Sequence, residues 1–184
     1  MADLNPELLA QVLRESLAKG KRPYVTVAGE SMAPLLRRGD QVGLAPAELD
    51  ALRPGDVIVY QGPYELTSHR YWGRSAEDSR PLLLTRGDRP AAFDAPAPAD
   101  ALVGRVVARR RCQRVLALDS GPGGWLNRRL ADLARLEYRY LLSPNGRGRR
   151  PALHRRLARG MIYRGAQALA EAVGRVSSQA EREP

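Results

Sequence analysis

The residues of this chain that could do nucleophilic and acid–base chemistry are a serine, a histidine and two aspartates. Ser31 stands in AGESMAPLLRRGD, between a bend and a short apolar run. A serine hydroxyl attacks a carbonyl only when a base takes its proton, so a nucleophilic Ser31 requires a base elsewhere in the chain. The alternative is that Ser31 caps a helix.

Bases that could activate this serine are few, because the chain has only two histidines and two lysines. Lys19 and Lys21 precede the part of the chain that is rich in strand patterns. We expect His154 to be solvated, since it stands among arginines on the polar side of a predicted helix. His69 lies on a predicted strand, ELTSHRYW, and is the candidate base; the alternative is a surface or core strand histidine.

Two carboxylates follow a predicted apolar strand in the segment LLLTRGDRPAAFD. Either Asp88 or Asp94 could orient an imidazole by accepting a hydrogen bond from its Nδ1–H. Taken singly, each could instead be a turn residue, Asp88 after Gly87 especially. The residues alone leave open which aspartate contacts His69.

Length and composition predict one core that folds without cross-links. A chain of 184 residues with 43% hydrophobic and 5% aromatic residues should bury mostly aliphatic side chains. The single cysteine, Cys112, cannot form an internal disulfide, and its surroundings suggest no metal set, so we expect neither metal nor cofactor. No segment approaches the roughly 20 apolar residues of a membrane span, and the N-terminus is too polar for a secretory signal. We therefore expect a soluble, cytoplasmic chain.

The excess of positive charge lies in the second half of the chain. Residues 1–100 hold 12 Lys and Arg against 14 Asp and Glu, whereas residues 101–184 hold 18 against 6. A basic tail could meet nucleic acid, an anionic membrane or an acidic partner. We do not expect nucleic acid, because heavy arginine usage accounts for the charge and the leading helix is too small for a DNA-reading domain.

Hydrophobic periodicity predicts a helix followed by a strand-rich region. Residues 6–18 have helical spacing, with apolar positions Leu8, Leu9, Val12, Leu13 and Leu17. Short β-rich runs follow, separated by Gly, Pro and Asp: YVTV, QVGLA, DVIVY, YELTSHRYW, PLLLT, LVGRVVA and RVLAL. Their close succession favours an antiparallel or mixed β-core. The segment AAFDAPAPAD has the pattern of an irregular loop.

Helical spacing returns after the GPGG at 121–124. The first helix has one apolar face, made of Trp125, Leu126, Leu130, Leu133, Leu136, Tyr140 and Leu141. The second begins near Pro151, with Leu153, Leu157, Met161, Ile162, Leu169, Val173 and Val176 on one side. Its arginine-rich polar side favours attachment of residues 151–176 to an anionic membrane surface. The alternative is that both helices pack their leucine faces on each other or on the β-core.

These patterns divide the chain into four parts. We expect residues 1–22 to form an N-terminal helix, residues 23–119 a β domain that holds the candidate catalytic residues, residues 120–176 a C-terminal helical appendage, and residues 177–184 a disordered tail. The fold class is therefore α+β.

Several blocks of the chain occur in the order found in a known family. They are GESMAPLLRRGDQVGLA, LRPGDVIVY, SHRYWG, LLLTRGDRPAAFD and LVGRVV, and they span about residues 24–109. Over this range the chain resembles the catalytic domain of signal peptidase I, in the histidine type of archaea and the endoplasmic reticulum. Bacterial signal peptidases and the related SOS-repressor peptidases use a lysine base. This chain has no lysine after residue 21, which selects the histidine type.

The resemblance implies a fold and a set of residue roles. The fold would be the mainly antiparallel or mixed β-core that signal peptidases share with SOS-repressor peptidases. Ser31 would be the nucleophile, His69 the general base, and Asp88 and Asp94 the two acidic residues. Met32 and Pro34 would shape the turn and the wall of the substrate groove, and the backbone amides of Ser31 or Met32 would form part of the oxyanion hole. Glu30 would place a negative charge close to that hole.

The expected function is that of a serine endopeptidase that removes a leader or signal-like segment from a peptide or protein substrate. Signal peptidases usually carry a membrane-spanning anchor; here we expect peripheral membrane attachment in its place. One alternative is a noncatalytic module on the same fold that binds an extended peptide. The other is a self-cleaving repressor-like switch, for which the 30 residues before Ser31 offer neither a convincing DNA-binding domain nor a scissile linker.

Overall fold

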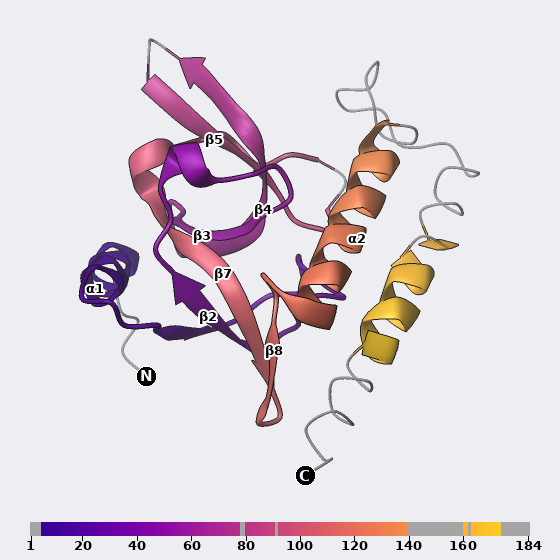
Figure 1. Cartoon of the computed structure of the whole chain (residues 1–184). Coiled ribbons are helices and arrows are strands. Elements are labelled where there is room, and N and C mark those ends of the chain that lie inside the picture. Colours follow the sequence, from indigo (N-terminus) through magenta and orange to yellow (C-terminus); the bar gives the residue numbers. More distant parts are fainter. Residues whose placement is uncertain (1–4, 78–79, 91, 140–159, 162, 174–184) are drawn as a thin grey trace.

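A computed structural model of the chain describes residues 5–77, 80–90, 92–139, 160–161 and 163–173. The fold is α+β, with a curled antiparallel sheet that helices flank (Figure 1). The predicted fold class is thus confirmed at this level. The predicted tail, residues 177–184, lies outside the described residues.

The sheet is built from strands that pair in the order β1-β2-β7-β3-β4-β5-β6, and every pairing is antiparallel. β7 pairs with β2 along one edge, and along its other edge first with β3 and then with β8. The strands are β1 (Tyr24–Thr26), β2 (Gln41–Ala45), β3 (Val57–Gln61), β4 (Leu66–Glu77), β5 (Arg80–Arg86), β6 (Ala97–Pro98), β7 (Leu102–Arg111) and β8 (Arg114–Ala117).

The seven predicted strands are confirmed, with ends shifted by a few residues. The segment AAFDAPAPAD also contains the two-residue strand β6 and the start of a short 3₁₀ helix, Ala99–Ala101. β6 pairs with β5 and returns this segment to the sheet. A second 3₁₀ helix, Leu49–Ala51, lies between β2 and β3.

The central strand β3 is buried on both faces, which explains its run of apolar residues. Val57 and Val59 point into the main core, whereas Ile58 and Tyr60 belong to a smaller second cluster. The pairing registers shift in β2, β3 and β4, where bulges increase the local twist. The sheet therefore curls, and a core forms on each of its faces.

Helix α1 (Pro6–Ala18) begins where the sequence predicts. The side chain of Asn5 accepts a hydrogen bond from the amide of Glu7 at 2.9 Å, and proline occupies the first turn. Leu13 and Leu17 are buried in the main core as expected, together with Ala10. Leu8 and Val12 are exposed, so the buried face of α1 is narrower than the sequence predicts.

Helix α2 (Gly121–Glu137) packs on β8 at close range. A Cβ on Gly123 would lie 2.0 Å from the carbonyl oxygen of Ala117, so only glycine permits this approach. Leu126 and Leu130 are buried as predicted. Trp125 and Leu136, which were assigned to the same face, are exposed. The small residues Ala131 and Ala134 are buried instead, and their short side chains let the helix lie close to the sheet.

A further helix covers residues 163–173. Ala166, Ala170 and Val173 are buried in the main core, and Arg37 forms an ion pair with Glu171 at 3.6 Å. This side of residues 163–173 therefore packs within the protein, while Met161, in the helical residues 160–161, is exposed. Most of the other apolar positions predicted for the last helix, and Tyr140 and Leu141, lie outside the described residues. Within the part that the structure describes, no helix combines the length and apolarity needed to cross a bilayer.

Candidate active site

Ser31 lies in a tight turn between β1 and β2. The amide of Ala33 donates to the carbonyl of Glu30, and the amide of Leu36 donates to the carbonyl of Met32. Met32 and Leu36 are buried in the main core and anchor the turn. The hydroxyl of Ser31 bonds to a side chain far along the chain, so Ser31 does not act as a helix cap.

The structure brings Ser31, His69 and one of the two aspartates into a line of hydrogen bonds. The Oγ of Ser31 lies 2.8 Å from the Nε2 of His69, and the Nδ1 of His69 lies 2.6 Å from the Oδ2 of Asp94. His69 stands in β4 and is buried, so the imidazole has little freedom to turn away. Asp94 is therefore the aspartate that orients His69.

The carboxylate of Asp94 is held by two further hydroxyl groups. The Oδ2 atom accepts hydrogen bonds from Thr85 Oγ1 at 2.7 Å and from the Tyr60 hydroxyl at 3.3 Å. Burial alone would raise the pKa of Asp94, but the hydrogen bond and charge of His69, together with the two hydroxyls, lower it below its usual value. Burial also raises the pKa of Tyr60, which keeps that hydroxyl a neutral donor.

The ionised Asp94 fixes the tautomer of the imidazole. A carboxylate can only accept, so the Nδ1 atom of His69 must carry the proton in this contact. When the ring carries only this proton, its Nε2 atom presents a lone pair to the hydroxyl of Ser31. This is the arrangement in which a histidine can take the proton of a serine.

Asp88, the other candidate, faces a different partner. Its two carboxylate oxygens accept hydrogen bonds from Nε and Nη2 of Arg70, both at 2.7 Å. The side chains of Arg70 and Asp88 are 0% and 7% exposed, so the pair is buried. The structure therefore separates the two predicted acidic residues: Asp94 lies on the imidazole, and Asp88 forms a buried ion pair.

The segment just after β5 lies against the serine and the histidine. The amide of Arg89 donates to the carbonyl of Ser31 at 2.8 Å. A Cβ on Gly87 would lie 2.8 Å from that carbonyl oxygen and 3.1 Å from His69 Nε2, so glycine leaves the space that the imidazole occupies. The backbone amide of Asp94 donates to the carbonyl of Thr85 at 2.9 Å, and this bond holds Asp94 beside the end of β5.

Two charged residues near the serine turn have structural partners. The carboxylate of Glu30 accepts a hydrogen bond from the amide of Arg38 at 3.2 Å, which ties this charge to the turn. Arg109 of β7 donates to the carbonyl of Leu35 at 2.9 Å. Burial, with the nearby charge of Arg111, lowers the pKa of Arg109 to about 10, so it remains protonated at neutral pH. Arg109 thus helps to hold the turn that contains Ser31 through its bond to Leu35.

A groove of about 1190 Å³ opens over the hydrogen-bonded line of Ser31, His69 and Asp94. Its walls are β1 with residues 27–32, the β3–β4 hairpin, and residues 94–101, and Arg14 of α1 lies at its border. β1 is the terminal strand of the sheet among the described residues and pairs only with β2. Much of the lining is small or apolar: Val25, Val27, Ala28, Gly29, Ala95, Pro96, Ala97 and Ala101.

The two residues predicted to shape the groove differ in position. Met32 lies in the main core and also touches the groove. Pro34 follows a cis peptide bond in the turn and is buried, but it does not line the groove. Among the described residues, no group of three or more His, Cys, Asp or Glu side chains could hold a metal ion.

Sequence reasoning missed the polar residues that support the site. Thr85 and Tyr60 stand at the ends of predicted strands, and each places a hydroxyl on the buried face. Arg70 directly follows His69, and its burial could not be expected, because arginine is almost never fully buried unless it is paired. For Tyr60 and Thr85, the available signal was a hydroxyl residue at the end of an apolar strand run, whereas Arg70 stands in a polar run that gives no such signal.

Comparison of the chain with protein-family models and with curated proteins gave no match in either case.

Proposed function

We propose that this chain is a serine endopeptidase of the signal peptidase I type, and that its β-core is the fold of that family. The observation that carries the proposal is the unbroken line from Ser31 through His69 to Asp94, with separations of 2.8 and 2.6 Å. A nucleophile, a base and a group that orients the base are the parts that serine peptidases share across unrelated folds. The sequence of blocks that resembles signal peptidase I supports the choice of family.

The proposed reaction begins when His69 Nε2 takes the proton of Ser31 and Oγ attacks the carbonyl carbon of the scissile peptide bond. Asp94 stabilises the imidazolium, which then protonates the leaving amine. Water activated by His69 releases the acyl group from Ser31. General-base assistance of this kind contributes about 10² to 10⁴-fold. The amides of Ser31 and Met32 are the proposed oxyanion donors, and such a donor contributes about 2.7 to 4 kcal/mol.

The groove supports an extended peptide as the substrate. The edge of β1 beside Ser31 can add one more strand through main-chain hydrogen bonds. Small lining residues such as Ala28 and Ala97 leave room for side chains of the bound peptide. The proposed substrate is a leader or signal-like segment, with the small residues before the scissile bond that the family resemblance implies.

Attachment of residues 151–176 to an anionic membrane surface stays a prediction. The buried Ala166 and Ala170 belong to the core, so insertion into lipid would have to use other side chains of this range. The arginine-rich polar side remains the basis of the prediction.

The test of the proposed function is acylation of Ser31 by a fluorophosphonate, read by intact mass, together with cleavage of a peptide library. We expect one adduct on the wild-type protein, none on Ser31→Ala, and cleavage by the wild type alone. A Ser120→Ala variant is the matched control and should be labelled like the wild type. Binding of peptides with neither labelling nor cleavage would support the noncatalytic module instead.

Substitution of Gly87 tests the close packing over the site. We expect Gly87→Ala to slow labelling and cleavage at least tenfold, roughly the effect of misplacing a catalytic group by a fraction of an ångström. The new methyl would lie 2.8 Å from both the Ser31 carbonyl oxygen and Pro90 Cδ and 3.1 Å from His69 Nε2, so the packing around the site must shift. Gly165→Ala is the control, since a Cβ there meets nothing within 4 Å. Equal labelling rates in the two variants would contradict this role of Gly87.

A further inference from the structure

The catalytic strand β4 presents two neighbouring side chains to opposite faces of the sheet. Successive residues of a strand alternate in direction. His69 reaches Ser31 on one face, and Arg70 reaches Asn127 of α2 on the other. Their partners on β3 agree, because Ile58 opposite His69 belongs to the second cluster and Val57 opposite Arg70 to the main core. Helix α2 therefore contacts the residue next to the candidate base.

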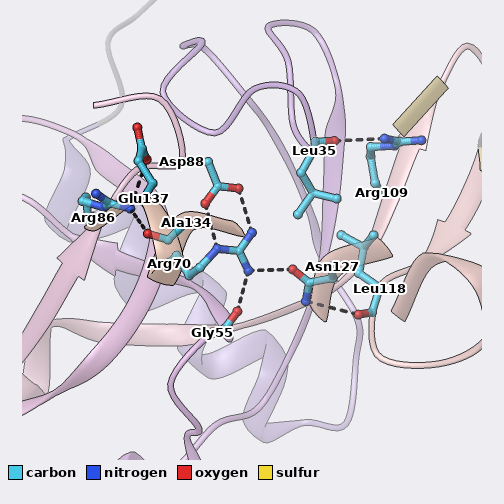
Figure 2. Close-up of polar contacts among 10 residues, drawn as sticks. All are labelled: Leu35, Gly55, Arg70, Arg86, Asp88, Arg109, Leu118, Asn127, Ala134 and Glu137. Atoms are coloured by element: carbon cyan, nitrogen blue, oxygen red, sulfur yellow. Dashed lines mark hydrogen bonds and ion pairs between the residues drawn. The ribbon is translucent and has the colours of Figure 1, made fainter. Parts of the chain in front are cut away.

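Arg70 is the centre of a buried polar network. Besides its two bonds to Asp88, its Nη1 atom donates to the Oδ1 of Asn127 at 2.8 Å and to the carbonyl of Gly55 at 2.6 Å (Figure 2). Asn127 is held in turn by a bond of 3.4 Å from its Nδ2 to the carbonyl of Leu118. The guanidinium of Arg70 is 0% exposed, so its orientation depends on the acceptors that bind it. Asn127 thus fixes the direction of Arg70, and Arg70 fixes Asp88.

A second set of contacts joins the same segment to α2. Arg86, one residue before Gly87, donates to the carbonyl of Ala134 at 2.9 Å and lies 3.6 Å from the carboxylate of Glu137 (Figure 2). Phe93, one residue before Asp94, packs edge-on against Tyr138 with ring centroids 5.0 Å apart. Arg86 and Phe93 therefore hold the two ends of this segment to α2 and to Tyr138, which follows it. Asp88, between them, is linked to α2 through Arg70 and Asn127.

This segment carries the atoms that align the site. It contains Asp94, the glycine beside His69 Nε2, and the amide that bonds to the carbonyl of Ser31. We propose that Asn127 is a positioning residue for the Ser31–His69–Asp94 line, which acts through Arg70 and Asp88. The proposal rests on the proposed peptidase function. It makes α2 a working part of the catalytic domain, where the sequence predicts an appendage.

The test compares three variants in the full chain. Asn127→Leu removes the acceptor at similar size, and Asn127→Asp restores it. Leu130→Ala, one turn further along α2, removes buried apolar volume from the main core without touching the network. We expect Asn127→Leu to slow fluorophosphonate labelling about tenfold to a hundredfold, the cost of misplacing catalytic groups by up to 1 Å. Asn127→Asp should recover most of the rate, and Leu130→Ala should lower the unfolding temperature while the folded protein labels at the wild-type rate.

A second readout separates this proposal from the peptidase proposal. The Nδ1 proton of His69, shared with Asp94, should give a strongly downfield NMR resonance in the wild type and in Asn127→Asp. We expect Asn127→Leu to shift or broaden it, and Leu130→Ala to leave it unchanged. Absence of labelling in the wild type would overturn the peptidase function, while this resonance would still report the alignment. An unchanged resonance in Asn127→Leu, or equal slowing by Leu130→Ala, would overturn the role of Asn127.

Discussion

Ser31→Ala and His69→Ala are each expected to abolish peptide cleavage while leaving the fold intact. Loss of the serine or histidine of a peptidase triad lowers kcat about 10⁶-fold, because neither residue works without the other. Both side chains meet in one hydrogen bond at the groove, and neither is needed to hold the sheet together. The measurement is kcat on a cleaved library peptide, with circular dichroism and thermal unfolding to confirm the fold.

The matched control for the histidine is His154→Ala, which changes the other histidine of the chain. It should retain wild-type kcat. The double variant Ser31→Ala/His69→Ala should be no less active than either single variant, since the two residues act as a unit. Substantial cleavage by Ser31→Ala would show that another group performs the reaction.

Asp94→Asn and Asp88→Asn are expected to fail in different ways. Asp94→Asn should lower kcat about 10⁴-fold, as found when the triad aspartate becomes an amide, because the ring is then held in the wrong tautomer. The effect of Asp94→Asn on stability should be small, because Asp94 lines the groove and the side-chain oxygen of the asparagine can still accept a hydrogen bond from Thr85. Asp88→Asn should instead lower the free energy of unfolding by about 3 to 5 kcal/mol, because it leaves Arg70 buried without its counter-charge.

These two variants are separated by measuring kcat and chemical denaturation on the same preparations. Asp94→Asn should show a near-normal denaturation midpoint and little activity. Asp88→Asn should show a lowered midpoint, with a kcat per folded molecule well above that of Asp94→Asn. The reverse ranking of kcat would mean that the ion pair, and not the Asp94 hydrogen bond, sets the reactivity of His69.

The strands could be predicted because burial leaves a simple pattern in the sequence. β3 is covered on both faces and therefore has an unbroken apolar run, and the turns between strands contain Gly, Pro or Asp. The helical faces were predicted less well. Periodicity shows that a helix has an apolar side but not how wide its buried face is. In α1, Leu8 is exposed and Ala10 is buried; in α2, Leu136 is exposed and Ala134 is buried.

The candidate site could be predicted only in part. The scarcity of bases singled out His69, whereas the role of Ser31 as nucleophile was implied by the family resemblance of its sequence block. The choice between Asp88 and Asp94 depends on the path of the loop after β5, which turns Asp88 toward Arg70 and brings Asp94 back to Thr85. No local pattern encodes such a path, since it is set by contacts with α2, which lies far along the chain.

The position of β7 between β2 and β3 sets when the sheet around Ser31 can be completed during synthesis. Ser31 precedes β2, and His69 follows β3 on β4; in the described sheet, β7 is the strand that pairs with both β2 and β3. The ribosome produces β7 after all three residues of the catalytic line. The paired sheet that carries the Ser31 turn and His69 is therefore complete only after about residue 111 has been synthesised.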